Sequence, residues 1–464
     1  MGVEHERPMT QSSATRTTTR QLAEWVRDAR QRTFELVADL SEEQLLGPQL
    51  DIVNPLLWEI GHVAWFQERW VLRHALGHQP IRPDVDTLYD SATIPHDTRW
   101  DLALPSRDTT LSFLRAVRDA VLEVLDRGES SARLAYFVQL AVFHEDMHTE
   151  AFTYARQTHG WPAPTLGVGP ASPITDSGCG PHAGDCTVPG GQFMLGADRV
   201  DAFVFDNEKW AHPVRVEPFA IARAPVTQSE FVAFVEGAGY SRREFWNDDG
   251  WRWRESAGAE HPVYWRRDSP GNWQRRDFDQ WVRLEPHRPV IHVNWFEASA
   301  YCRWAGRRLT TELEWEVATA GQSDTASPRL ASTPPHSLLT THLSPQKRRF
   351  PWGDHPPAAE HANLNWHGMG CVDVAAFLAS DSAFGCRQMI GNVWEWTASD
   401  FLRYPGFVAD PYKEYSQPWF GTHKVLRGGC WVTRSRLLRN TWRNFYTPDR
   451  RDVWAGFRTC ALEP

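Results

Sequence analysis

Two histidines of this 464-residue chain stand four positions apart, in the sequence His144-Glu-Asp-Met-His148. Residues at this spacing share one face of a helix, where two imidazoles can bind the same metal ion. A third histidine, His62, lies in an apolar segment that also has helical character, and helical bundles build metal sites from side chains on facing helices. The sequence therefore predicts a metal site formed by His62, His144 and His148. The competing interpretation is that these are ordinary surface or core histidines.

The type of metal follows from the number of ligands. Three neutral nitrogens on one face of an octahedral ion leave three neighbouring positions open, which suits Fe(II) that must hold oxygen together with a thiolate or a selenolate. The residues His144 to His148 also fit the zinc-peptidase pattern H-E-x-x-H, in which Glu145 would be the general base. A metallopeptidase is the weaker alternative.

The histidines fall in a region whose apolar residues recur every three or four positions, as in helices with one buried face. We expect four amphipathic helices between Thr18 and about Gln157, with one long connection over residues 78–107. The expected helices cover residues 18–40, 55–77, 108–127 and 132–158. This set predicts a four-helix bundle over residues 18–160.

The pattern changes in the second part of the chain. Residues 161–186 are rich in Gly and Pro and are expected to form a linker. Beyond them, short apolar runs alternate with Gly, Pro, Asn and Asp, and helices are expected at residues 227–236, 295–305 and 311–320. We therefore expect residues 187–464 to form an irregular α+β domain with little regular sheet, which makes the whole chain an α+β multidomain protein.

Composition and the remaining segments narrow the function classes. Residues 1–17 are expected to be a disordered tail, and residues 323–349, rich in Ser, Thr and Pro, a mobile surface insertion. The N-terminus lacks the apolar core of a secretory signal, and no run approaches the roughly 20 apolar residues of a membrane span. We therefore expect a cytoplasmic protein without membrane contact. The net charge of −9 gives no reason to bind nucleic acid.

The seven cysteines are dispersed and odd in number. In a reducing compartment they are expected to be free thiols. Pairing or metal binding by Cys179 and Cys186 is a lesser alternative.

Longer motifs make both parts of the chain recognisable. The N-terminal half resembles the DinB-like bundle of ergothioneine-type sulfoxide synthases, and the C-terminal half resembles the formylglycine-generating-enzyme fold, an elaborated C-type-lectin-like domain. The motifs are NPLLWEIGHVAWFQERW and FHEDMHTEAF in the first half, and PVTQSEFVAFVEGAGY, PVIHVNWFEASAYCRWAGRRLTTELEWEVATAG, FPWGD, GNVWEWTASDF, VLRGGCW and AGFRTC in the second. The resemblance covers about residues 20–462, and the pairing of both domains is specific to the synthases.

The resemblance implies an oxygen-dependent enzyme of the non-heme iron class. In that family a three-histidine Fe(II) site binds O2 and a chalcogen donor, and a C–S or C–Se bond forms at the imidazole C2 of hercynine, the Nα-trimethylated betaine of histidine. By resemblance, His62, His144 and His148 are the iron ligands. The copper-binding cysteine pair of the formylglycine enzymes has no match here, so a sulfatase activator is not expected.

Three departures from the family pattern fall where the donor or the acceptor should bind. Residues 88–108 replace the family phrase FNSYYEAVG and the arginines that hold the donor's carboxylates, and Met147 replaces the usual glutamine beside a ligand. Tyr446 replaces an acidic residue that contacts γ-glutamylcysteine in one branch. Together they argue for the selenoneine-forming branch, whose donor is a selenosugar. A sulfur-using synthase with a cysteine or γ-glutamylcysteine donor is the alternative.

Candidate substrate-binding residues come from the departing loop and from the C-terminal region. A trimethylammonium group has no N–H to donate and should lie among aromatic faces, whereas a hydroxyl-rich donor calls for polar side chains in the loop. The candidates are Trp442, Asn444, Phe445, Tyr446 and Met147, together with Tyr89, Asp90 and Arg99 in the loop. Core packing or loop capping is the alternative explanation for them.

A tyrosine near the iron donates a proton in some relatives, and the sequence does not choose between Tyr404, Tyr412 and Tyr415. Two interpretations from other classes compete with the synthase. One is a thiol-dependent transferase or hydrolase whose C-terminal domain is only structural, and the other is a non-enzymatic carbohydrate-binding module. The expected partners are small molecules; the sequence indicates no oligomeric state, and a monomer is compatible with it.

Overall fold

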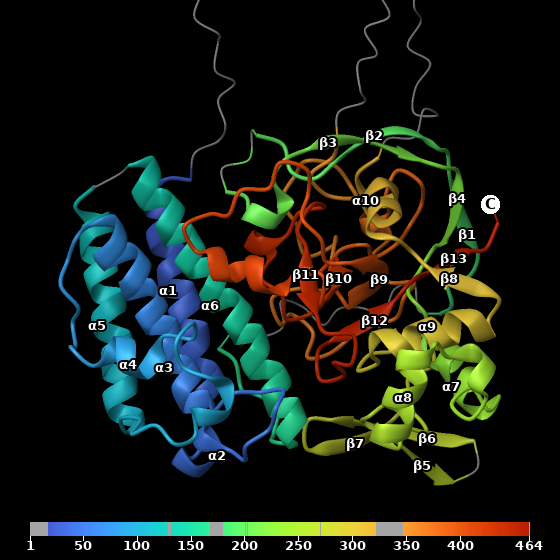
Figure 1. Cartoon of the computed structure of the whole chain (residues 1–464), viewed down its shortest axis with the longest axis horizontal. Coiled ribbons are helices and arrows are strands. Elements are labelled where there is room, and N and C mark those ends of the chain that lie inside the picture. The colour runs from blue at the N-terminus through green and yellow to red at the C-terminus, as the bar shows by residue number, and fades with distance from the viewer. Residues whose placement is uncertain are drawn as a thin grey trace, which may run out of the picture.

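The computed structural model has two parts side by side, a helical part and a part in which strands and short helices mix (Figure 1). It describes residues 17–128, 131–167, 180–199, 201, 203–269, 271–321 and 347–463. Nearly all of the expected tail, the middle of the expected linker with Cys179, and most of the expected insertion lie outside the described residues. The predicted α+β multidomain class is confirmed.

Four long helices form the bundle, and each lies where the apolar periodicity predicts one. They are α1 (Thr19–Val37), α3 (Leu56–Gln67), α5 (Arg107–Asp126) and α6 (Ala132–His159). The side chains of Thr18, Ser106 and Ser131 accept hydrogen bonds from first-turn N–H groups, which explains where three of the helices begin. The connections contain α2 (Glu42–Leu46), a π-helical continuation of α3 (Glu68–Ala75) and α4 (Val85–Tyr89).

Helix α6 lies between the rest of the bundle and the second part of the chain (Figure 1). Its buried carboxylates explain why it stays there: Glu150 accepts hydrogen bonds from Trp394 Nε1 at 2.6 Å and from Thr433 Oγ1 at 2.8 Å. Asp146 accepts two hydrogen bonds of 2.6 Å from Arg436. These bonds fix the histidines of α6 relative to the second part of the chain.

Two four-stranded sheets organise the second part, with strand orders β1-β4-β13-β8 and β11-β10-β9-β12. A two-stranded sheet (β2-β3) and a three-stranded sheet (β5-β6-β7) complete the described strands. The strands are β1 (Asp185–Val188), β2 (Gly191–Leu195), β3 (His212–Val216), β4 (Phe219–Ala222), β5 (Trp265–Ser269), β6 (Asn272–Asp277), β7 (Gln280–Arg283), β8 (Arg307–Leu309), β9 (Trp394–Asp400), β10 (Lys424–Arg427), β11 (Asn444–Tyr446), β12 (Ala455–Phe457) and β13 (Thr459–Ala461). Because β10 lies between β9 and β11, the long β9–β10 connection ends at Lys424, beside Tyr446 of β11.

The helices of this part are α7 (Gln228–Glu236), α8 (Asp248–Ala257), α9 (Trp295–Trp304) and α10 (Glu312–Ala320). Three of them match the sequence-based expectation, but α8 does not. Only Gly250 of α8 is buried, so this helix has no periodic apolar face from which it could be predicted. Its start is set instead by Asn247, whose side chain accepts a hydrogen bond from the Gly250 N–H.

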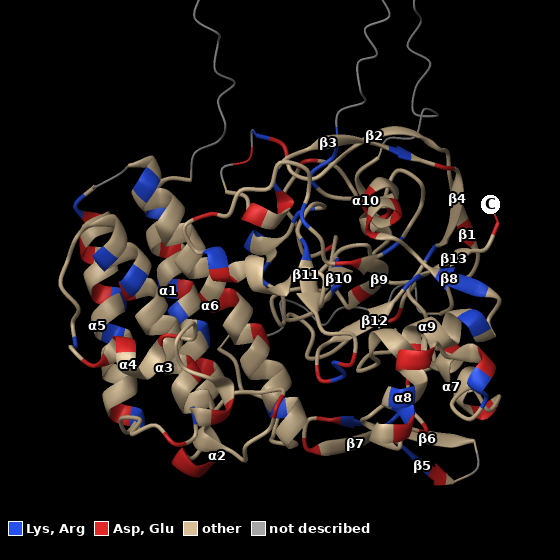
Figure 2. Ribbon diagram, viewed as in Figure 1, with Lys and Arg blue, Asp and Glu red and all other residues tan. Residues whose placement is uncertain are grey.

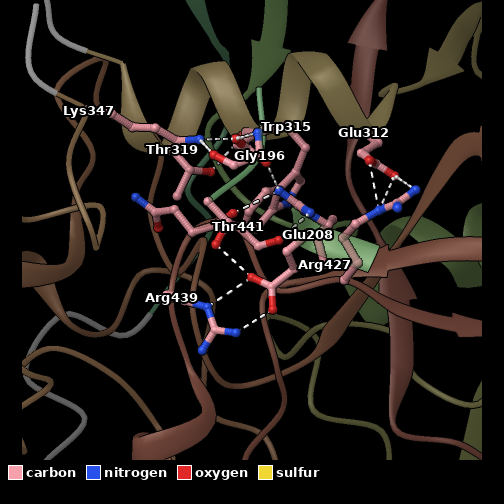
Figure 3. A network of polar contacts seen from close by, with 12 residues as sticks. Gly196, Glu208, Glu312, Trp315, Thr319, Lys347, Arg427, Arg439 and Thr441 are labelled. Atoms are coloured by element: carbon pink, nitrogen blue, oxygen red, sulfur yellow. Dashed lines mark hydrogen bonds and ion pairs between the residues drawn. The ribbon is translucent and has the colours of Figure 1, made fainter. Parts of the chain in front are cut away.

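A buried network of charged residues holds the C-terminal loops against α10 (Figure 3). Its ion pairs are Glu208–Arg439, Glu316–Arg427, Glu316–Lys347 and Glu312–Arg443. Breaking one partner of such a buried pair leaves an uncompensated charge and costs about 3–5 kcal/mol. The network therefore fixes the path of the chain that leads into β11.

Acidic and basic residues are interspersed along α1 and α5 of the bundle (Figure 2). Among the helices of the described residues, none combines the length and the apolar character needed to cross a membrane.

Candidate metal centre

The side chains of His62, His144 and His148 converge where α3 faces α6. One ligand atom from each histidine lies within 4.8 Å of those of the other two, and His144 Nε2 is 3.2 Å from His148 Nε2. His62 and His144 are buried, whereas the side chain of His148 is 20% exposed. The cluster is thus enclosed by the bundle on one side and accessible beside His148.

Hydrogen bonds on the far side of two imidazoles fix their orientation. His62 Nδ1 donates to the backbone carbonyl of Tyr89 at 2.8 Å, and His148 Nδ1 bonds to Glu59 Oε2 at 2.6 Å. A ring that donates from Nδ1 carries its lone pair on Nε2, which is the form that binds a metal ion. His144 Nδ1 is buried without a hydrogen-bond partner among the described residues.

A second layer of polar residues supports Glu59. Asn54 Nδ2 donates to Glu59 Oε1 at 2.5 Å, and Arg99 Nη1 donates to Asn54 Oδ1 at 2.6 Å. The guanidinium of Arg99 also lies 3.9 Å from the ring centroid of Trp58. Arg99 was expected to bind the donor. In this structure it is the outermost member of a series of hydrogen bonds that runs through Asn54 and Glu59 to His148.

The electrostatics keep His62 and His144 neutral. Burial, and next the proximity of His148, lowers the pKa of His62 to about 3, and burial lowers the pKa of His144 well below its ordinary value. Burial alone would raise the pKa of Glu59, but His148 and Asn54 outweigh it and hold this pKa below its ordinary value. A carboxylate behind a ligand imidazole is the usual second layer of a histidine metal site, so the donor set fits a divalent transition metal.

The structure excludes the role that a peptidase would give to Glu145. Its carboxylate accepts hydrogen bonds of 2.7 Å from Arg30 Nε and from Thr33 Oγ1, and Glu145 is 1% exposed. One residue along a helix turns the side chain by about 100°, which points Glu145 into the bundle and away from the histidine cluster.

Two of the three candidate tyrosines lie near the histidine cluster. The ring of Tyr412 lies 4.8 Å from Phe66, which stacks on His144 at 3.6 Å, and 6.1 Å from His144 itself. The hydroxyl of Tyr415 is 3.8 Å from Met147 Sδ and accepts a 3.4 Å hydrogen bond from Trp442 Nε1. Both tyrosines, Met147 and Trp442 are therefore neighbours.

Tyr404 lies elsewhere. Its hydroxyl donates to Glu312 at 2.5 Å, and its ring lies 4.2 Å from the guanidinium of Arg443. Tyr404 thus belongs to the buried charge network of α10 and is not placed to serve as a proton donor at the metal centre.

The residues of β11 point alternately to opposite sides, as in any strand. Phe445 stacks on Phe401 at 4.0 Å, and its backbone N–H bonds to Asn444 Oδ1 at 2.8 Å. The ring of Tyr446 lies 5.1 Å from the guanidinium of Arg450. Burial, with nearby Tyr154 and Glu150, raises the pKa of Tyr446 well above its ordinary value, which places this hydroxyl beside α6.

The predicted donor loop behaves differently from expectation at Tyr89 and Asp90. The side chain of Tyr89 is 1% exposed and packs against Gly61, where a Cβ would stand 2.2 Å from the ring. Tyr89 therefore contributes its carbonyl to His62 and cannot offer its side chain to a substrate. Asp90 Oδ1 accepts the N–H of Ala92 at 3.0 Å and caps a turn.

A cavity of about 170 Å³ lies next to Glu59. Its polar lining includes Asp51, Asn54, His96, Tyr154 and Arg450. The charge of Arg450 is already paired, because its Nε and Nη2 donate to Asp452 at 2.6 Å. The cavity is therefore rich in hydrogen-bonding groups and has no free cation among these residues.

Sequence reasoning missed several of these residues. Glu59 and Asn54 support His148, and Phe66 lies under Tyr412. The only available signal was the position of Glu59, three residues before His62 and hence on the same helix face. Phe66 looked like an ordinary core residue of an apolar helix.

Comparisons with known proteins agree with both parts of this architecture. Residues 26–152 match the family model of the DinB superfamily, and residues 175–462 match the sulfatase-modifying factor enzyme 1-like domain. The chain is 38% identical over 447 residues to a hercynine oxygenase of Mycolicibacterium thermoresistibile, covering 94% of each chain. It is 36% identical over 450 residues to a hercynine oxygenase of Mycobacterium tuberculosis, covering 95% of this chain and 99% of the relative.

A formylglycine-generating enzyme of Thermomonospora curvata is 30% identical over 321 residues, which covers 61% of this chain and 94% of that enzyme. This similarity reaches only part of the present chain, whereas the similarity to the two oxygenases extends over both of its parts.

Proposed function

Because the chain belongs to the hercynine oxygenase family, we propose that it is a non-heme Fe(II) enzyme that uses O2 to join a chalcogen donor to the imidazole C2 of hercynine. As a member of this family it is an oxidoreductase-type enzyme. The proposal depends most on one observation. His62, His144 and His148 converge on one point, and two of them are oriented from behind by a carbonyl and a carboxylate.

Iron, when bound by the three histidines, supplies the electrons and the open positions that oxygen chemistry requires. The protein supplies the rest. Glu59 and the Tyr89 carbonyl keep two imidazoles in the metal-binding form. Phe66 covers one face of His144 and shields that side of the site from water.

For hercynine we propose a position beside α6, near Met147, Trp442 and Tyr446. A trimethylammonium cation is attracted to aromatic faces, and Trp442 and Tyr446 supply such faces next to α6. Asn444 remains a candidate for the carboxylate or the imidazole of hercynine, provided that its side chain leaves its bond to the Phe445 N–H.

As proton donor we propose Tyr412. Burial raises its pKa above the ordinary value, so its hydroxyl keeps its proton at neutral pH and can give it to a basic group formed in the reaction. Tyr415 is the less suitable choice because Trp442 and Met147 already contact its hydroxyl.

For the donor we propose a selenosugar, so that selenoneine is the product. The cavity beside Glu59 supports this choice because Asp51, Asn54, His96 and Tyr154 suit hydroxyl groups, and the charge of Arg450 is taken by Asp452. A γ-glutamylcysteine donor would bring two carboxylates, for which this lining offers no unpaired arginine or lysine.

A thiol donor, with a C–S bond in the product, is the second candidate. It is favoured by the 36–38% identity of the chain to the two hercynine oxygenases over 94% or more of its length.

The test is anaerobic loading with Fe(II), followed by oxygen uptake and product mass with hercynine and each donor. We expect 1-seleno-β-D-glucose to be used at least about tenfold better than cysteine or γ-glutamylcysteine, since a site built for hydroxyl groups rejects ligands that leave its polar groups unpaired. Equal or better use of γ-glutamylcysteine would replace the selenium assignment by the sulfur one. Absence of oxygen uptake with every donor would contradict the function itself. His144→Ala is the matched control for metal-dependent turnover.

A further inference from the structure

One buried carboxylate holds both ends of the segment that carries Tyr412 and Tyr415. Asp206 Oδ2 accepts the backbone N–H of Asp410 at 3.4 Å, and Asp206 Oδ1 accepts the hydroxyl of Ser416 at 2.5 Å. Asp206 is 2% exposed. Residues 410–416 thus form a loop whose start and end are tied to the same side chain.

Further polar contacts join this loop to the bundle. Asp410 accepts a 2.8 Å hydrogen bond from the hydroxyl of Tyr136 on α6 and pairs with Lys209 at 2.6 Å. Ser416 Oγ accepts a 3.0 Å hydrogen bond from Asn207 Nδ2. Both ends of the loop are therefore bound by residues 206–209. The end at Asp410 is also hydrogen-bonded to α6, the helix that bears His144 and His148.

The tyrosines between these ends depend on the same stretch. Tyr415 stacks at 4.4 Å on Phe205, the residue directly before Asp206, and its hydroxyl reaches Met147. Tyr412 packs on Phe66 and, through it, on His144. The loop has only short 3-10 turns of its own, such as Lys413–Tyr415, so its position must come from these contacts.

We propose that Asp206 is a positioning residue: it sets the place of Tyr412 and Tyr415 over the metal centre by holding the two ends of residues 410–416. The consequence for turnover rests on the proposed function, but the consequence for the loop does not. An asparagine at this position can accept one of the two hydrogen bonds through its oxygen, while its NH2 group can accept none.

The burial of this carboxylate supports a positioning role over a stabilising one. Burial, with Asp410 adding to it, raises the pKa of Asp206 to about 6, which means that keeping it charged at neutral pH opposes folding. A residue that costs stability and holds a segment beside a reactive centre fits the pattern of functional sites.

The first experiment compares hydrogen–deuterium exchange of the intact chain with that of Asp206→Asn and Ser416→Ala, without substrates. We expect exchange in residues 410–416 to increase about tenfold in Asp206→Asn, because a charge-assisted acceptor is lost at one end, and less in Ser416→Ala. Asp185→Asn, which breaks the remote ion pair with Arg307, is the matched control. Exchange of residues 410–416 that equals the control in both variants overturns the inference.

The second experiment measures Co(II) binding and turnover of the iron-loaded enzyme. We expect Asp206→Asn to bind Co(II) like the original chain and to have a kcat reduced about tenfold. In a Tyr412→Phe background the same substitution should have little further effect, since it acts through that tyrosine. Additive losses, or weaker Co(II) binding, would show a general structural role and overturn the inference. If increased exchange is found in an enzyme that does not act on hercynine, the loop assignment stands and the proposed function fails.

Discussion

The two faces of the candidate site are built from different kinds of structure. On the metal face, all three histidines lie on long helices, α3 and α6, and two of them are held by hydrogen bonds of 2.6–2.8 Å. On the opposite face, Tyr412 and Tyr415 lie in an irregular connection and Tyr446 in a strand of three residues.

This difference teaches how one metal chemistry can be combined with different substrates. A helix face fixes the relative positions of ligands through its own backbone hydrogen bonds, so the metal face changes little when loops change. The other face is positioned by contacts between residues far apart in the sequence, such as those of Asp206 with residues 410–416. Substitutions there can alter the donor while leaving the metal face intact.

The largest expected effect separates the two faces directly. His144→Ala removes one of three ligands, so we expect Co(II) or Fe(II) affinity to fall more than about 100-fold, beyond the usual effect of losing a second-layer partner, and turnover to be lost. His74→Ala is the control, because His74 packs on Trp70 and Phe137 outside the cluster. Metal binding by titration calorimetry checks this, and unchanged affinity would refute the metal site.

The next effect tests the opposite face without touching the metal. Tyr412→Phe removes only a hydroxyl, and we expect turnover to fall about 100-fold, the size of a lost general acid, with unchanged Co(II) affinity. Tyr404→Phe is the matched control: it lies in the α10 charge network, so it should lower the melting temperature and leave kcat unchanged. If Tyr404→Phe lost turnover and Tyr412→Phe kept it, Tyr404 would be the proton donor.

A pH experiment tests the cost of the positioning contact. The pKa of Asp206 is raised from 3.8 to about 6, so between these values the folded state holds a proton that the unfolded state has lost. The free energy of unfolding should therefore fall as pH rises from about 4 to about 6, and Asp206 should contribute up to about 2 kcal/mol of this fall.

The fall should be smaller in Asp206→Asn, measured by urea unfolding at several pH values. The charged and titratable groups around Asp206 are Asp410, Lys209, Tyr415 and, from α6, Tyr136. Asp185→Asn should keep the full fall. An equal slope in all three proteins would show that Asp206 does not titrate in this range.

The smallest expected effect lies on the metal face. Glu59→Gln keeps the size of the side chain and removes the charge behind His148, so we expect metal affinity to fall about tenfold. The exposed Glu42→Gln is the control. Competition between the protein and a chelator gives the measurement, and no change would mean that Glu59 only orients the ring of His148.

Much of the architecture could be predicted because its signals are local. The four bundle helices, with their apolar period and their Ser and Thr caps, lie where the sequence places them. The short helix α8 could not be predicted because it buries almost none of its surface. Tyr89 was misjudged for a related reason: its ring fills the space above Gly61, and no local pattern shows which residue faces a distant glycine.

The sequence by itself determined the histidine set, since a spacing of four on a helix fixes two ligands on one face and an apolar helix supplies the third. Only the tertiary structure decided which tyrosines accompany them. Tyr404, Tyr412 and Tyr415 stand close together in the chain, yet Glu312 binds the first and Asp206 directs the other two toward α6. The physical reason is that a loop without its own repeating hydrogen bonds takes its position from partners elsewhere in the fold.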